Sequence, residues 1–402
     1  MNYKICLLSD HHISYNPRLW KEAFFWEQCG YEVVIINMWI SEKALERDQE
    51  LLKGHNIRNI CYLNLIPGKI SDRKRNYYRI RKRFYAEIQK RFRWGAPWAI
   101  SYAPEKMIEA ALKENANVYS AHLECAFYAG RTLIQKGKKV FYDFEDWYSN
   151  DYLVPERPVQ LLSSLERFAL NHGLFCLATS ESMAQSLTAY YSCTRKPVVV
   201  YNGFSQKENI VLHARSISSK PRLIWFSRNV GKYRGLEKIV EALQYVDTPI
   251  ELHLLGESTD EYRNEITNSF HNSVHSVHFH DFIPHHQLTG FISGFSLGLA
   301  VEENVNANRK LTVTNKILQY IQAGIRVLGT DTAGQSEVQE YFPDRIFLVP
   351  TEGSVQEWAN QIQRCLNLPL NKSDDYLEVF NNVFSKEAQE LKLKKLAEEH
   401  FT

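Results

Sequence analysis

The hydrophobic positions of the chain form short apolar runs that alternate with longer amphipathic stretches. In the first half, seven runs predict strands: Ile5–Ser9, Tyr31–Asn37, Asn59–Leu63, Val118–Ser120, Val140–Tyr142, Leu174–Ala178 and Val198–Val200. In the second half, six runs do so: Arg222–Phe226, Glu251–Leu255, Val277–Phe279, Ser296–Val301, Arg326–Leu328 and Ile346–Val349. Strands that alternate with helices are typical of parallel sheets covered on both faces. The pattern therefore predicts an α/β fold with two doubly wound domains.

Turn and polar residues divide this pattern into two halves. Asn202-Gly203 is a turn pair, and the segment 205–220 that follows is polar. We expect an N-terminal domain at residues 1–204, a linker at 205–220 and a second domain at 221–372. The last thirty residues, 373–402, are charged and amphipathic, which predicts a C-terminal helix beyond the second sheet.

Composition narrows the class of protein. The chain has 402 residues, of which 44% are hydrophobic and 13% aromatic, so it can bury sizeable cores. No run approaches the ~18 apolar residues of a membrane span, and the start, MNYKICLLSDHH, lacks a signal-peptide pattern. Seven scattered cysteines without a C-x-x-C pair indicate reduced thiols rather than a disulfide or zinc framework. We expect a cytoplasmic protein.

Positive charge is concentrated in one segment. Residues 69–93 hold eleven Lys or Arg against two acidic residues, a net +9, so the rest of the chain sums to −7. Within it, residues 72–93 predict an amphipathic helix. Its apolar stripe consists of Tyr77, Ile80, Phe84, Ile88 and Phe92.

Such a helix suits the surface of an anionic membrane, so we expect peripheral contact with the inner membrane face. The residues expected to make this contact are Arg79, Arg81, Lys82 and Arg83. In the alternative, the stripe packs on the N-terminal sheet and the basic face is simply solvated. No nucleic-acid-binding motif is present, so nucleic acid is not an expected partner.

Charged residues mark a strand–loop–helix unit in residues 298–338. An apolar strand ends in Glu302 and Glu303, and after a polar loop a helix opens at Asn315 and Lys316. These residues lie where a parallel sheet presents the carboxyl ends of its strands and a helix presents its amino end. In α/β proteins, nucleotides and phosphates bind at such places. No G-x-G triplet occurs, so the dinucleotide fingerprint of dehydrogenases is missing.

Six segments, in register over nearly the whole chain, carry a resemblance to a known family. They are SDHHISYNPRLWKEA, VYSAHLE, FYDFEDWYS, VVVYNGF, WFSRNVGKYRGLEKIVEAL and TNKILQYIQAGIRVLGTD. They resemble motifs of the retaining GT-B glycosyltransferases, specifically family 4. The resemblance implies two Rossmann-like domains that face each other across a cleft. It also implies sugar transfer from a nucleoside-diphosphate donor to an acceptor, with retention of anomeric configuration.

Cations are expected at the donor diphosphate. Departure of the diphosphate builds up negative charge, which fixed positive groups stabilise. Arg228 ends the first strand of the second domain, and Arg234 lies just before Gly235 and its helix. The resemblance assigns these two arginines to the diphosphate and His122 to the donor or the reacting sugar. The other residues expected to bind the donor are Glu302, Glu303, Asn315, Lys316 and Gln319.

Two positions depart from the family pattern at the donor site. The family often has Glu-x7-Glu there, but this chain has Leu311 and Gln319 at the two positions. A Gln amide can hydrogen-bond ribose hydroxyls without the help of a charge. Glu302 or Glu303 is the expected substitute for the first glutamate.

The acceptor is expected on the first domain. The residues expected there are Arg18, Glu145 and Asp146, and the acceptor is a saccharide or a lipid-linked saccharide. No D-x-D triplet is present to hold a metal on the diphosphate, so we expect a metal-independent enzyme without a cofactor. His278 and His280 are expected to be surface residues.

Two alternatives to glycosyl transfer stay open at this point. A nucleotide-sugar epimerase of similar two-domain shape would turn over the donor without an acceptor. A catalytically silent nucleotide-sugar-binding partner would do neither, and Gln319 in place of a glutamate points mildly in that direction. The donor base, the sugar and the linkage do not follow from the sequence.

Overall fold

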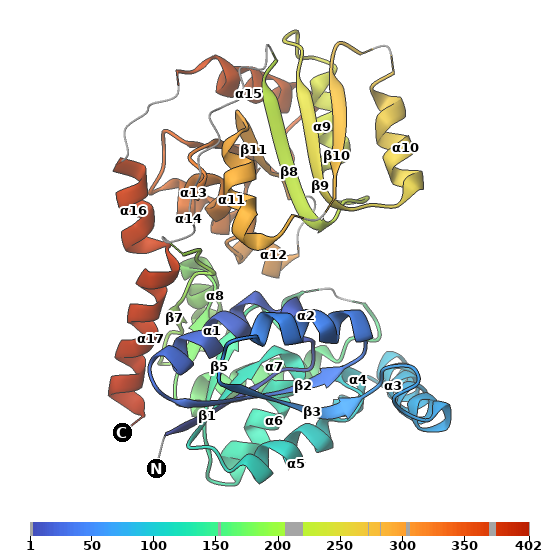
Figure 1. The fold of residues 1–402 in the computed structure, drawn as a ribbon, viewed down its shortest axis with the longest axis vertical. Coiled ribbons are helices and arrows are strands. Elements are labelled where there is room, and N and C mark those ends of the chain that lie inside the picture. Colours follow the sequence, from blue (N-terminus) through green and yellow to red (C-terminus); the bar gives the residue numbers. More distant parts are fainter. Residues whose placement is uncertain are drawn as a thin grey trace. The chain divides into compact units, whose positions relative to one another are not determined.

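The computed structural model describes residues 3–151, 154–205, 220–271, 273–281, 283–302, 306–369 and 375–401 (Figure 1). The chain forms two compact units. The first comprises Met1–Val200, Asn306–Asn308 and Leu393–Thr402, and the second comprises Tyr201–Val305 and Arg309–Lys392. The chain thus enters the second unit beside the Asn202-Gly203 turn. Most of the linker expected at 205–220 lies outside the described residues.

The first unit is built on a sheet of seven parallel strands in the order β3-β2-β1-β4-β5-β6-β7. The strands are β1 (Lys4–Leu8), β2 (Glu32–Trp39), β3 (Ile57–Asn64), β4 (Val118–His122), β5 (Lys139–Phe144), β6 (Cys176–Ala178) and β7 (Val198–Val199). The helices are η1 (Ile13–Tyr15), α1 (Pro17–Gln28), α2 (Glu42–Leu52), α3 (Asp72–Phe92), α4 (Pro97–Ile100), α5 (Pro104–Glu114), α6 (Leu123–Gln135), η2 (Tyr148–Asn150), α7 (Val159–His172) and α8 (Glu181–Tyr191). All seven expected strands are confirmed.

The second unit is built on a sheet of six parallel strands in the order β10-β9-β8-β11-β12-β13. The strands are β8 (Arg222–Asn229), β9 (Glu251–Glu257), β10 (Ser276–His280), β11 (Leu297–Ala300), β12 (Arg326–Asp331) and β13 (Ile346–Pro350). The helices are α9 (Leu236–Leu243), α10 (Asp260–Ser269), α11 (His285–Ser293), α12 (Ala307–Leu311), α13 (Asn315–Gln322), α14 (Ala333–Gln339) and α15 (Val355–Asn367). All six expected strands are confirmed. Uninterrupted apolar runs predict such strands well, because both faces of the sheet are covered by helices.

Both sheets reverse their strand order at one point. β1 pairs with β2 on one side and with β4 on the other, and β8 pairs in the same way with β9 and β11. Connections on the two sides of such a point leave in opposite directions, which opens a crevice outside the carboxyl ends of the two central strands. His122 is the last residue of β4, and Glu302 follows β11. The topology therefore places a candidate residue at the reversal point of each sheet.

The C-terminus is helical, as expected, but it forms two helices instead of one. These are α16 (Asp375–Val383) and α17 (Lys386–His400). Between them Phe384 and Ser385 are fully buried, and the Ser385 hydroxyl caps α17 by accepting from the Ala388 N–H at 3.1 Å. Gly203 is needed beside this break, since a Cβ there would lie 2.2 Å from the Phe384 carbonyl oxygen.

Gly298 in β11 leaves the space that the Tyr320 ring fills. A Cβ at position 298 would lie 2.4 Å from this ring, which is fully buried. The Tyr320 hydroxyl donates to the carbonyls of Ile224 and Leu299 at 3.1 and 3.3 Å. Tyr320 thus ties α13 to β8 and β11, the three elements at the reversal point of the second sheet.

We expect Gly298→Ala to destabilise the protein. The added methyl group must push against a buried ring that two hydrogen bonds hold in place, and such overpacking costs about 1–3 kcal/mol. The measurement is the free energy of unfolding in urea. Gly294→Ala is the matched control, because a Cβ at position 294 meets nothing closer than 3.5 Å. Equal stabilities of the two variants would contradict this account of the packing.

Candidate functional site

His122 lies at the centre of a buried charge network in the first unit. Its side chain is fully buried at the end of β4. Nε2 lies 3.0 Å from Glu22 Oε2, and Nδ1 lies 2.8 Å from Glu145 Oε1. Glu22 belongs to α1, and Glu145 directly follows β5. Three elements that are distant in sequence therefore converge on one imidazole.

This arrangement keeps His122 protonated. Burial lowers the pKa of an imidazole, but the charge of Glu22 and the hydrogen bonds to Glu145 and Glu22 outweigh burial and raise the pKa of His122 to about 10. Both ring N–H groups then donate to carboxylates, so His122 holds Glu22 and Glu145 in place. Its contact with the donor or the reacting sugar stays a prediction. Of the two carboxylates, Glu145 is the more exposed, at 14% against 4% for Glu22.

Arg18 and Asp143 form a second buried ion pair beside this network. Arg18 Nε and Nη2 donate to the two Asp143 carboxylate oxygens, each at 2.8 Å, and Nη1 donates to the Val200 carbonyl at 2.5 Å. The guanidinium is 8% exposed. Its charge is therefore already compensated inside the unit, and the expected contact of Arg18 with an acceptor stays a prediction.

Glu145 and Asp146 follow β5, as expected for residues on the acceptor side. Asn16, the N-cap of α1, donates from Nδ2 to Glu145 Oε1 at 2.7 Å. Burial raises the pKa of Asp146 to about 6, so this carboxyl takes up a proton much more readily than a surface aspartate.

The loop after β1 adds polar residues to the same crevice. His11 Nδ1 lies 3.1 Å from Asp10 Oδ1. Burial raises the pKa of Asp10, but the effects of His11 and Lys82 are larger together and lower it. The charged carboxylate is therefore stabilised. Leu123, directly after His122, has a φ of 69°, which side-chain-bearing residues rarely adopt. Such strain tends to occur at functional sites.

In the second unit, Lys316 and Glu302 form an ion pair at the reversal point of the sheet. Lys316 Nζ lies 3.0 Å from Glu302 Oε1, and the two side chains are 12% and 11% exposed. Nζ also lies 5.1 Å from the centre of the Trp225 ring in β8. The carboxylate and the aromatic face together fix the ammonium of Lys316 in position. The sequence did not predict these two contacts.

Two buried polar atoms near this pair have no hydrogen-bond partner among the described residues. They are Trp225 Nε1 and Thr314 Oγ1. Thr314 is the N-cap of α13, but its side chain accepts no capping hydrogen bond. Buried polar groups are nearly always hydrogen-bonded. The indole N–H of Trp225 in β8 and the hydroxyl of Thr314 at the amino end of α13 fit a ligand that is rich in oxygen acceptors.

The other residues expected at the donor occupy different positions. Asn315 Oδ1 accepts from Asn202 Nδ2 at 2.9 Å. Gln319 is 1% exposed, and its Nε2 donates to Thr289 Oγ1 of α11 at 3.2 Å. The amide of Gln319 is thus already hydrogen-bonded inside the unit, and its contact with the donor ribose stays a prediction. Glu303 lies outside the described residues.

Arg228 and Arg234 lie where the sequence placed them. Arg228 is exposed near the carboxyl end of β8, and Arg234 is partly exposed directly before Gly235. Gly235 has a φ of 78° and is the N-cap of α9, so the chain turns sharply at Arg234. Convergence of the two guanidinium groups on one diphosphate stays a prediction.

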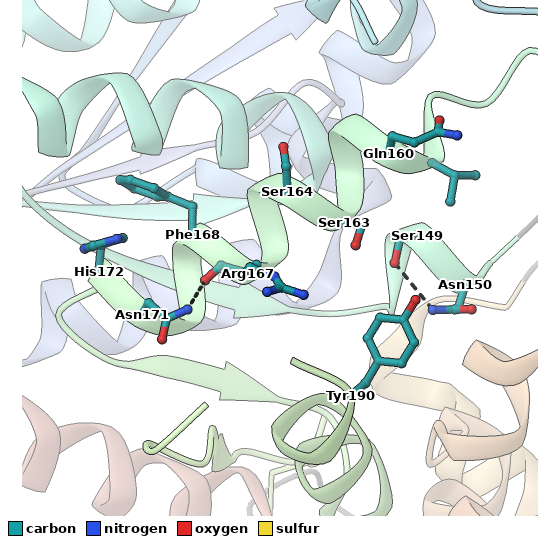
Figure 2. A pocket seen from close by; sticks show the side chains of 11 residues that line it. Ser149, Asn150, Gln160, Ser163, Ser164, Arg167, Phe168, Asn171, His172 and Tyr190 are labelled. Carbon is teal, nitrogen blue, oxygen red and sulfur yellow. Dashed lines mark hydrogen bonds between the residues drawn. The ribbon is translucent and has the colours of Figure 1, made fainter. Parts of the chain in front are cut away.

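A pocket of about 940 Å³ lies along α7 of the first unit (Figure 2). Its polar lining consists of hydroxyl, amide and imidazole groups and one guanidinium, that of Arg167. Phe168 and Tyr190 add aromatic rings, and none of the described lining residues is acidic. Figure 2 shows Tyr190 reaching toward Ser149 and Ser163 across the pocket. Such a mixture suits a saccharide or another polyhydroxyl ligand.

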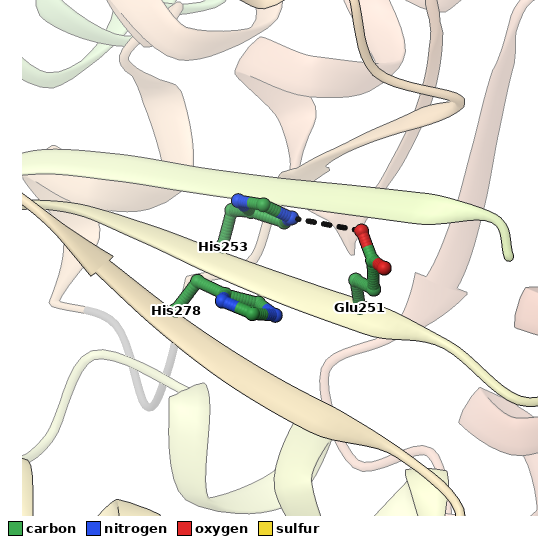
Figure 3. A group of neighbouring side chains, drawn as sticks. All are labelled: Glu251, His253 and His278. Atoms are coloured by element: carbon green, nitrogen blue, oxygen red, sulfur yellow. Dashed lines mark ion pairs between the residues drawn. The ribbon is translucent and has the colours of Figure 1, made fainter. Parts of the chain in front are cut away.

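Two groups of described side chains come close enough together to hold a metal ion. One is Glu251, His253 and His278 on the neighbouring strands β9 and β10 (Figure 3). Arg222 Nε already lies 3.5 Å from His253 Nε2, and burial together with Arg222 lowers the pKa of His253 to about 3. The other is Glu22, His122 and Asp143. Arg222 Nε also lies 3.7 Å from Glu251 Oε2, and in the second group His122 itself lies 3.0 Å from Glu22 Oε2. Metal independence stays a prediction.

Sequence reasoning missed Glu22, Asp143 and Trp225. Glu22 gave a usable signal, since it falls on the apolar face of α1 among buried residues such as Trp26. The indole N–H of Trp26 donates to Glu22 Oε1 at 3.0 Å. Asp143 gave one too, as a charged residue inside an apolar strand. Trp225 gave none, because an aromatic residue in a strand is most often plain core.

Residues 220–368, most of the second unit, match the family described as Glycosyl transferases group 1. No curated protein sequence is detectably similar to the chain. HepE of Anabaena, in complex with UDP and glucose, is similar over 99% of this chain and 100% of its own, with a TM-score of 0.68 and 15% identity.

Two further solved structures match the whole chain. A glycosyltransferase from Rickettsia africae matches over 99% of this chain and 98% of its own, with a TM-score of 0.66 and 15% identity. A putative UDP-N-acetylglucosamine 2-epimerase from Listeria monocytogenes matches over 100% and 97%, with a TM-score of 0.58 and 13% identity. The expected GT-B fold with two Rossmann-like domains is thus confirmed. Together with the family match, it supports a GT-B glycosyltransferase.

In the described part of the chain, no helix combines the length and the apolar character needed to cross a bilayer.

We expect the stability contribution of His122 to depend on pH. Since its folded pKa lies above the ordinary ~6.5, the contribution is complete below pH ~6.5 and is lost as pH rises through about 10. The measurement is the difference in free energy of unfolding between wild type and His122→Gln across this range. His253→Gln is the control, because a buried histidine with a lowered pKa is neutral in both states above pH ~7.5. Parallel curves for the two variants above that pH would contradict the network.

Proposed function

We propose that the protein is a retaining, metal-independent glycosyltransferase that moves a sugar from a nucleoside diphosphate to an acceptor. The observation that carries the proposal is the Lys316–Glu302 ion pair at the reversal point of the second sheet. It lies at the amino end of α13, beside two buried polar atoms that lack partners among the described residues. Charge, helix end and unsatisfied donors together fit a diphosphate sugar.

The donor is proposed to bind to the second unit. Its diphosphate would face Lys316 and the amino end of α13, with Arg228 and Arg234 adding charge from the β8 side. Glu302 holds the ammonium in place and offers its second carboxylate oxygen to sugar hydroxyls. When the bond between the anomeric carbon and the diphosphate breaks, these fixed cations stabilise the negative charge that remains on the diphosphate.

Retention is proposed from the resemblance to family 4. The acceptor hydroxyl would attack the anomeric carbon on the face from which the diphosphate departs, and its proton would pass to a departing diphosphate oxygen. One C–O bond forms while another breaks, so no further reactant is needed. The protonated, fully hydrogen-bonded His122 agrees with this scheme, because it is no free base at neutral pH.

The acceptor is proposed to be a saccharide, free or lipid-linked, bound to the first unit. Glu145 is the least buried carboxylate of the His122 network, and Asn16 and His122 hold it in one orientation. A carboxylate fixed in this way can accept hydrogen bonds from sugar hydroxyls. The pocket along α7, which Arg167 and Tyr190 help to line, offers room for further sugar units of an extended acceptor.

An epimerase is the second candidate, because a putative epimerase is among the similar structures. The two functions differ in what they do to the donor. An epimerase changes the sugar without needing an acceptor, whereas a transferase releases nucleoside diphosphate in proportion to the acceptor supplied. A silent binding partner would bind the donor and change nothing.

A panel of nucleoside-diphosphate sugars, each with and without a saccharide mixture, tests the proposal. We expect acceptor-dependent release of nucleoside diphosphate that persists in strong chelator, because Arg228, Arg234 and Lys316 supply the positive charge. NMR of the product should show the anomeric configuration of the donor. Activity that chelation abolishes and manganese restores would refute metal independence. Conversion of the donor without acceptor would favour the epimerase.

Arg228→Ala and Arg234→Ala should each lower turnover much more than they weaken donor binding. The charge on the diphosphate grows as the bond breaks, and loss of one such stabilising group typically costs ~100- to 1000-fold in rate. Arg228→Lys should recover only part of the loss, because an ammonium cannot make the two parallel contacts of a guanidinium. Transfer rate, donor affinity and thermal melts are measured together, with the exposed Lys53→Ala as control. Near-normal turnover in a folded double variant would remove both arginines from the site.

A further inference from the structure

Four of the five residues of the apolar stripe of α3 lie on the outside of the first unit, and the fifth, Ile88, is partly buried. Tyr77, Ile80, Phe84 and Phe92 are 56%, 65%, 59% and 72% exposed, and Trp94 just beyond the helix is 61% exposed. Of the fourteen large hydrophobic side chains exposed in the described residues, these five fall within eighteen consecutive positions. The alternative in which the stripe packs on the N-terminal sheet is therefore wrong for these residues.

The opposite side of α3 attaches the helix to the unit. Tyr78 and Gln89 are buried there. Arg81 Nη2 donates to Glu105 Oε1 at 2.8 Å, and Lys82 Nζ lies 4.7 Å from the centre of the Tyr102 ring. Two of the four residues expected on the membrane, Arg81 and Lys82, thus turn toward the protein. The orientation of α3 is fixed by these contacts rather than by its stripe.

Basic residues lie along the exposed side of α3. Those exposed on the helix or at its end are Arg73, Lys74, Arg79, Arg83, Lys90, Arg91 and Arg93. At 100° per residue, Arg79 and Arg83 lie on one flank of the row formed by Tyr77, Ile80 and Phe84. Acidic residues on the helix are only Asp72 and Glu87. The exposed side therefore combines a continuous apolar row with a strongly positive flank.

We propose that α3 docks the protein on an anionic lipid bilayer. Tyr77, Ile80 and Phe84 would lie at the boundary between headgroups and acyl chains, and the flanking arginines would contact lipid phosphates. An anionic lipid surface offers apolar contact to the row and negative charge to the cations along the whole helix. It therefore complements both features of the exposed side. Figure 1 shows α3 at the margin of the first unit, beside α4. The proposal does not depend on the glycosyl transfer proposed above.

Cosedimentation with vesicles tests this docking without any activity assay. We expect wild type to bind phosphatidylcholine vesicles that contain phosphatidylglycerol, to ignore pure phosphatidylcholine, and to release as salt rises. The double variant Arg79→Glu, Arg83→Glu should bind roughly 30-fold more weakly, at about fivefold for each basic residue lost. The double variant Ile80→Asn, Phe84→Asn should also bind more weakly, because it loses the apolar contact. Circular dichroism and thermal melts check that each variant is folded.

Matched controls come from exposed residues of the same kinds elsewhere. Lys53→Glu, Lys395→Glu reverses two charges on side chains 76% and 77% exposed, and Val274→Asn, Leu391→Asn replaces two apolar side chains 58% and 69% exposed. Both should bind like wild type. If charge reversal at Arg79 and Arg83 impairs folding, the double variant Arg79→Gln, Arg83→Gln replaces it. This variant should also bind more weakly than wild type, because it loses two positive charges.

Three results would overturn the docking proposal. Wild type could fail to bind the mixed vesicles, or the control variants could lose as much binding as the α3 variants. The α3 substitutions could instead abolish self-association or binding of RNA while leaving vesicle binding unchanged, which would assign the surface to another partner.

Discussion

Each unit depends on the parallel pairing of its first strand with its fourth, β1 with β4 and β8 with β11. Parallel strands end on the same edge of a sheet, so the residues that follow them are brought together there. In the first unit this edge gathers Asp10, His122 and Glu145. In the second, Arg228 and Glu302 follow neighbouring strands at this edge, and Lys316 at the start of α13 pairs with Glu302. The candidate residues are thus neighbours because of strand order, although more than a hundred positions separate Asp10 from His122 and Glu145 in the sequence.

Charge compensation then fixes these residues in place. A buried ion is costly unless a partner of opposite charge and further hydrogen bonds accompany it. His122 meets this condition with Glu22 and Glu145, and Lys316 meets it with Glu302. Side chains held in this way are preorganised, and preorganised charge is the most effective form of electrostatic stabilisation in enzymes.

The basic helix α3 shows a different use of charge. Its cations are mostly exposed, and the few that turn inward anchor the helix through Glu105 and Tyr102. Compensation for the remaining positive charge would come from outside the protein. A helix that is attached along one face and apolar and basic on the other can meet a surface without any change in the fold. The charges of the two candidate sites are compensated inside the protein, whereas those of the proposed docking surface are not.

The sequence by itself determined the elements and the class of fold. All thirteen expected strands exist, Asn16 caps α1, and Arg228, Glu302 and Lys316 lie at strand ends and a helix start, because local periodicity and capping are short-range properties. It did not determine the break between α16 and α17, which follows from the burial of Phe384 and Ser385. It also gave no sign that Lys316 would pair with Glu302 or that Glu22 would reach His122. Those contacts were decided by the tertiary structure, since strand order and packing bring together side chains that no local pattern relates.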